Sequence, residues 1–117
     1  MINVALLRKT LEHVTAHPEE WDQGRWLSDC GTRGCMAGHA CLLSGARVVS
    51  ATAYEVQIPG STVSHSVPYA ARRLLGLTLK QANALFEANN TLADLWHHAS
   101  RFTDGEIEIP PQLEDAS

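Results

Sequence analysis

Residues 30–43, with the sequence CGTRGCMAGHACLL, decide how this chain folds. Between Gly34 and Ser44 the sequence contains no Asp, Glu, Lys or Arg. A helix that is apolar on every side lies in the interior of a fold and not at its surface. We therefore predict a buried central helix that begins at Thr32 and runs to about Ser44, where Gly45 ends it.

Local signals on both sides of this segment predict four more helices. They are residues 4–16 with Asn3 as N-cap, residues 68–75 ended by Gly76, residues 79–87 opened by a Thr78–Gln81 capping box, and residues 92–102 opened by a Thr91–Asp94 capping box. Residues 46–66 are rich in β-branched and turn residues, which predicts one or two short strands, and residues 25–30 would form another. The expected fold is mainly α, with about five helices and minor short β-strands, in a small single domain of the α+β or all-α class.

The chain has 117 residues, of which 44% are hydrophobic and 19% are charged, as is typical of one globular domain. No apolar run approaches the roughly 20 residues of a membrane span. The N-terminus lacks the charge order of a secretory signal. Three cysteines, at positions 30, 35 and 41, without such a signal indicate free thiols. We therefore expect a cytoplasmic protein with no membrane association.

Charge is distributed unevenly along the chain. The formal net charge is −4, from 13 acidic and 9 basic residues. Residues 104–117 contain five of the acidic residues and no Lys or Arg. We predict one globular domain, residues 1–105, and an acidic tail with two prolines, residues 106–117, which forms an edge strand or is disordered. Neither part has the strongly basic surface that phosphate-dominated nucleic-acid binding requires.

Three stretches carry a resemblance to a known family: CGTRGCMAGHA at residues 30–40, LLGLTLKQANALF at 74–86 and NTLADL at 90–95. Together they resemble small proteins without an established activity that are common in actinobacteriophages and their actinobacterial hosts. The family pattern is similar to C-G-T-x-x-C-x-A-G-x-A followed by L-L-G-L-T-x-x-Q-A-x-x-L-F. The resemblance implies an accessory phage or prophage protein in the host-cell cytoplasm, and it implies no mechanism and no cofactor.

The sharpest chemical hypothesis is a zinc site. Cys30, Cys35 and His39 would provide three ligands, because Cys35 and His39 lie four residues apart on one helix face. The fourth ligand would be one of three other histidines, His65, His97 or His98. Cys41, however, lies about 240° around the helix from Cys35, so the three cysteines do not converge. Buried cysteines acting as small apolar residues also explain the pattern, and we expect no metal and no cofactor.

The same cysteines suggest two other chemistries. Cys35 in the first helical turn, with His39 as base, would form a thiol nucleophile. A histidine on the same helix, however, lies beside the thiol and not across a substrate cleft, so we expect no catalytic residue. A disulfide between Cys30 and Cys35 would be unusual in the cytoplasm.

The leading functional hypothesis is a non-enzymatic protein-interaction module, which binds a host protein or a second copy of the chain. The candidate interaction residues are Trp21, Trp26, Trp96 and His97, because tryptophan is over-represented among interface hot spots. A thiol or zinc-site protein is the first alternative. Weak DNA binding through Arg72, Arg73 and Lys80, beside a helix opened at Thr78, is the second, although nucleic acid is the less expected partner.

Overall fold

The computed structural model of the chain describes residues 1–26, 34–50 and 54–114. In these residues five α-helices accompany one three-stranded antiparallel sheet in the order β1-β2-β3, which confirms the predicted mainly helical α+β class. The helices are α1 (Val4–Ala16), α2 (Met36–Leu43), α3 (Val67–Leu75), α4 (Leu79–Leu85) and α5 (Leu92–Phe102). The strands are β1 (Arg47–Ser50), β2 (Glu55–Gln57) and β3 (Ser64–Ser66), and the 3-10 helices are η1 (Pro18–Glu20) and η2 (Pro111–Leu113).

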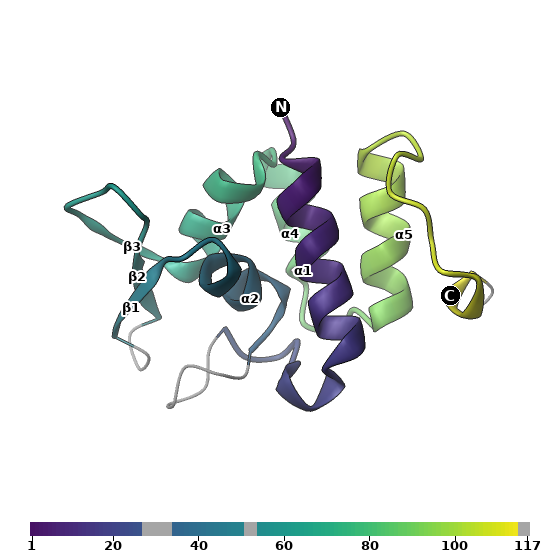
Figure 1. Ribbon diagram of the computed structural model, residues 1–117, viewed down its shortest axis with the longest axis horizontal. Helices are drawn as coiled ribbons and strands as arrows, with labels where there is room; N and C mark the ends of the chain where they lie inside the picture. Colours follow the sequence, from purple (N-terminus) through teal and green to yellow (C-terminus); the bar gives the residue numbers. More distant parts are fainter. Residues whose placement is uncertain (27–33, 51–53, 115–117) are drawn as a thin grey trace.

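Helix α2 lies between the sheet and α1, at the centre of the molecule (Figure 1). It packs against α1 and α3, and its residues from Met36 to Cys41 are all buried. This confirms the buried central helix that the absence of charge predicts. None of the described helices is long and apolar enough to cross a membrane.

The predicted start of this helix at Thr32 is wrong, and the reason is a contact with a distant segment. Gly34 forms a parallel β-bridge with Trp21. Its backbone nitrogen donates to the carbonyl oxygen of Glu20 at 3.0 Å, and its carbonyl oxygen accepts from the backbone nitrogen of Asp22 at 2.9 Å. These bonds keep the chain extended as far as Cys35, the N-cap, so α2 begins at Met36. Thr32 itself lies outside the described residues.

The side chain of Gln23 caps two helix ends at once. The N-cap residue of α2 makes no side-chain cap, and Gln23 Oε1 instead accepts from the backbone nitrogen of Met36 at 3.2 Å. Its Nε2 donates to the carbonyl oxygens of Leu85, at the end of α4, and Glu87, at 3.1 and 3.2 Å. Its Oε1 also accepts from the indole nitrogen of Trp21 at 3.0 Å. The amide, whose residue is only 7% exposed, thus makes all four of its bonds inside the fold.

Local end signals of the other helices are confirmed. Asn3 accepts a bond from the Leu6 backbone nitrogen, Thr78–Gln81 and Thr91–Asp94 make both bonds of their capping boxes, and Gly76 ends α3 in the left-handed conformation. Helix α4 ends at Leu85, before the expected Glu87. The predicted strands within residues 46–66 form the small sheet, whereas the strand expected at residues 25–30 falls largely outside the described residues.

Residues 106–109 form no strand, in contrast to the edge strand that their alternating pattern predicts. Ile107 is fully buried, and its backbone nitrogen donates to Thr103 Oγ1 at 3.1 Å. Arg8 Nη2 donates to the carbonyl oxygen of Glu106 at 3.1 Å. The segment therefore bonds to side chains of α1 and of the C-cap residue of α5, on the side of the molecule opposite the sheet (Figure 1), and Ile107 belongs to the core.

Replacing the capping amide by an apolar side chain of similar size tests its structural role. We expect Gln23→Leu to lower the free energy of unfolding by about 3 kcal/mol or more, because it leaves several buried backbone groups without partners. Urea denaturation of Gln23→Leu and of the exposed control Gln112→Leu measures this. Equal stability of the two variants would contradict the role.

Alanine substitutions at Gly76 and Gly105 together test the close contact between the N-terminus and the end of α3. Both have positive φ, +69° and +85°, so alanine at either position costs roughly 1 kcal/mol through backbone strain. At Gly76 an added Cβ would also collide with the backbone carbonyl of Met1, whereas at Gly105 it would meet nothing within 4 Å. We expect Gly76→Ala to lower the melting temperature clearly more than Gly105→Ala. Similar shifts would show that the N-terminal residue simply moves aside.

Candidate functional site

A concave surface between α3 and α4, called here the α3–α4 groove, encloses about 420 Å³. Its lining is mainly apolar and includes Trp26, Tyr69, Arg72, Leu79 and Phe86. Trp26 and Phe86 meet edge to face, with ring centroids 6.3 Å apart. A volume of this size with an apolar lining and few polar groups is typical of a binding pocket.

Half-buried Arg72, exposed Arg73 and large apolar side chains lie together at or near the edge of this groove. The guanidinium groups of Arg72 and Arg73 lie 5.6 and 5.8 Å from the centroid of the Tyr69 ring, within cation–π range. Tyr69 is 40% exposed and Leu79 is 66% exposed. Within the described residues, none of Arg72, Arg73 and Lys80 forms a salt bridge. In the described part of the chain, the residues considered for DNA binding are therefore cations without a salt bridge, close to an apolar groove.

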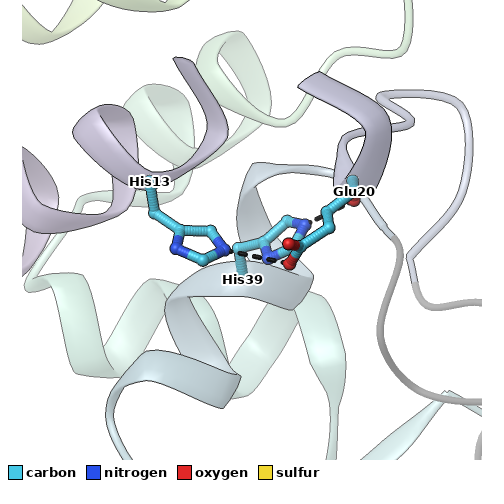
Figure 2. A group of neighbouring side chains, drawn as sticks. All are labelled: His13, Glu20 and His39. Atoms are coloured by element: carbon cyan, nitrogen blue, oxygen red, sulfur yellow. Dashed lines mark hydrogen bonds and ion pairs between the residues drawn. The ribbon is translucent and has the colours of Figure 1, made fainter. Parts of the chain in front are cut away.

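A second cluster lies across α2 from the sheet, where the end of α1, η1 and α2 meet. Its members, His13, Glu20 and His39, offer one ligand atom each, and these three atoms lie within 4.8 Å of one another (Figure 2). His13 Nε2 is 3.1 Å from Glu20 Oε1, and the rings of His13 and His39 are 5.2 Å apart at their centroids. His17 borders the cluster, with its Nδ1 3.7 Å from Glu20 Oε2.

His39 is held in one orientation and one tautomer. Its residue is 2% exposed, and Nε2 lies 2.7 Å from the backbone carbonyl oxygen of Glu20. A carbonyl only accepts, so Nε2 carries the proton. Burial lowers the pKa of His39, which keeps the ring neutral near pH 7. The lone pair of the neutral ring is therefore on Nδ1.

The two cysteines of the described residues are buried and unreactive. Burial raises the pKa of Cys35 to about 11, against the smaller opposing effect of backbone N–H groups in the first turn of α2. Burial also raises the pKa of Cys41 to about 12, and its thiol donates to the carbonyl oxygen of Val67. Because the thiolate is the nucleophile and the ligand, neither residue is set up for such chemistry at neutral pH. Cys30 lies outside the described residues.

Of the described residues considered as metal ligands from the sequence, the structure places only His39 in a group with converging ligand atoms. In the described part of the chain two groups have converging ligand atoms, His13–Glu20–His39 and His17–Glu19–Glu20, and neither includes Cys35, His65, His97 or His98. Neither His13 nor Glu20 is among the residues predicted from the sequence. The available signal is the spacing of His13 and His17, four residues apart at the end of a helix.

The four predicted interaction residues lie in different environments. Trp26 lines the α3–α4 groove. Trp21 is half-buried and bonded to Gln23. Trp96 is 5% exposed and donates to Thr15 Oγ1 at 2.9 Å, so it has little surface to offer a partner. His97 is half-buried, and its Nε2 has no hydrogen-bond partner among the described residues.

Comparison with known proteins gives no match: no family model matches the chain, and neither a curated protein nor a solved structure matches it. The proposals on function therefore rest on the geometry and chemistry of the α3–α4 groove and the histidine cluster.

The state of the thiols is measurable in the folded protein. We expect iodoacetamide at pH 8 to leave Cys35 and Cys41 unmodified, because burial keeps both protonated and shielded. Both residues fall in the tryptic fragment 34–47, whereas Cys30 falls in fragment 26–33, so mass spectrometry reads them separately. Guanidinium-unfolded protein is the positive control. Rapid native-state modification of fragment 34–47 would contradict the assigned burial.

Proposed function

We propose that the chain is a non-enzymatic protein-interaction module, and that its α3–α4 groove binds a partner segment with a bulky apolar side chain beside an acidic residue. The observation that carries this proposal is a mainly apolar groove of about 420 Å³ that Arg72 lines, with Arg73 beside the same Tyr69 ring and neither arginine in a salt bridge within the described residues. Aromatic residues and arginine are the residue types most enriched at interface hot spots.

Exposure of large apolar side chains supports the apolar half of this specificity. Leu79 and Tyr69 keep much of their surface in water, and a partner that covered them would gain the free energy of burying it. Trp26 and Phe86 form a rigid wall, which loses little conformational freedom on binding. The groove therefore favours one bulky side chain inserted between α3 and α4.

Basic side chains near the groove support the acidic half of the proposed specificity. Arg72 lines the groove, the guanidinium of Arg73 lies beside the Tyr69 ring, and Lys80 follows Leu79 in α4. A carboxylate beside the inserted side chain would pair with these cations, and arginine binds carboxylates in a bidentate geometry. Three cations on a chain with net charge −4 suit a short acidic contact better than a nucleic-acid backbone. The resemblance to small actinobacteriophage proteins favours a host-cell protein as the source of the segment.

A charge placed in the groove tests the proposal. Peptides selected from a displayed random library on the immobilised chain should carry an aromatic or aliphatic residue next to Asp or Glu. We expect Leu79→Glu to weaken their binding roughly tenfold or more, since it removes a central apolar contact and repels the acid. Fluorescence anisotropy with the selected peptide measures the affinity.

We expect Leu79→Glu to leave the fold intact, so that a change in affinity reports on the groove. Residue 79 is the first residue of α4, where a negative side chain is favoured by the helix dipole. The matched control is Val63→Glu, which changes a 58% exposed valine outside the groove. The proposal would be overturned if the selected peptides lacked the apolar–acidic pair, or if they bound Leu79→Glu as tightly as the wild type. It would also be overturned if the chain selectively bound an oligonucleotide in place of peptides, with steep salt dependence.

A further inference from the structure

The cluster at the end of α1 presents a ligand set that is common in metalloproteins. Two imidazoles and one carboxylate, from His13, His39 and Glu20, come from three different elements and point toward one another (Figure 2). Three protein ligands of this kind are typical of zinc sites that keep a fourth position for water. The turn from α1 into η1 brings His13 and Glu20 together, and the packing of α2 against α1 adds His39.

The hydrogen bond of His39 matches what a metal ligand requires. Histidines that bind metals commonly donate their second ring N–H to a backbone carbonyl or carboxylate, which fixes the ring and its tautomer. His39 makes such a bond through Nε2 to the carbonyl oxygen of Glu20, at 2.7 Å. The lone pair of the neutral ring is thereby on Nδ1, the ring nitrogen that would bind the ion. The same residue, Glu20, thus orients one ligand through its backbone and supplies another through its side chain.

The spacing of His13 and Glu20 is that of two ligands on one ion. Their Nε2 and Oε1 atoms are 3.1 Å apart. In a tetrahedral zinc site with bonds of roughly 2.0–2.1 Å, neighbouring ligand atoms are about 3.3 Å apart. A metal ion would therefore replace the proton that these two groups share, with only small movements of the side chains.

The charge around the cluster also favours a cation. In the described part of the chain, Glu20 pairs with His13 and His17 and with no Lys or Arg. Glu19 lies beside it, 3.4 Å from His17 Nδ1. The side chains of His13 and Glu20 are 27% and 38% exposed, so an ion can reach the site from solvent.

We infer that His13, Glu20 and His39 form a binding site for a divalent transition-metal ion, with zinc as the best-matched ion and water as the fourth ligand. The site is separate from the α3–α4 groove and does not depend on the proposed interaction function. Its ligands share only His39 with the Cys30–Cys35–His39 set considered from the sequence, of which Cys30 lies outside the described residues. A bound ion would link α1, η1 and α2.

Calorimetric titration of the metal-free, tag-free chain with zinc chloride tests the site. We expect one zinc ion per chain, and a melting temperature that rises with zinc concentration because the ion binds the folded state. Glu20→Gln and His13→Gln should each weaken zinc binding by about tenfold or more. These partly exposed positions are preferable to buried His39, whose replacement endangers folding. The control His98→Gln removes a histidine outside the cluster and should leave zinc affinity unchanged.

Cobalt(II) provides an independent readout. The wild-type chain should give the visible absorption of tetrahedral Co²⁺ without the sulfur-to-metal charge-transfer band of a thiolate site. The inference is overturned if the chain binds no zinc, or if Glu20→Gln and His13→Gln bind zinc as tightly as the wild type. A third test alkylates the cysteines in the unfolded protein and then refolds it. Loss of zinc binding in refolded protein with the native circular-dichroism spectrum would show that the cysteines bind the ion, and would also overturn the inference.

Discussion

The hydrogen bonds of the buried Gln23 side-chain amide are the interaction on which the arrangement of this fold depends. Gln23 lies in the segment after η1, yet its four hydrogen bonds reach the start of α2, the end of α4 and the indole of Trp21. A buried amide is expensive unless every donor and acceptor has a partner, and this amide reaches that condition only when both helix ends are in place. It therefore makes the positions of α2 and α4 mutually dependent.

The same segment also positions both candidate sites. Glu20 precedes Gln23 by three residues and belongs to the histidine cluster, whereas Trp26 follows it by three residues and lines the α3–α4 groove. The β-bridge between Trp21 and Gly34 fixes this segment against the entry to α2. A short irregular stretch thus contributes to both sites, and the bridge to Gly34 and the four bonds of the Gln23 side chain hold it in place.

Much of the fold could be predicted because its signals are local. The two capping boxes and Gly76 mark helix ends through contacts within a few residues, and the charge-free stretch marks α2 as buried. The start of α2 could not be predicted, because a bridge to Trp21 sets it. The His13–Glu20–His39 cluster could not be predicted for the same reason: His39 is conspicuous in the sequence, but nothing local shows that it meets His13 and Glu20.

Burial has opposite consequences for the two kinds of reactive side chain in α2 and its N-cap. Removing a group from water disfavours its charged form, so it raises the pKa of Cys35 and Cys41 and lowers that of His39. A thiol must ionise before it attacks or binds a metal, whereas an imidazole binds a metal in its neutral form. The burial that keeps the two thiols protonated therefore keeps the His39 ring neutral, and the bond from its Nε2 to the Glu20 carbonyl leaves the lone pair on Nδ1, where the proposed metal ion would bind.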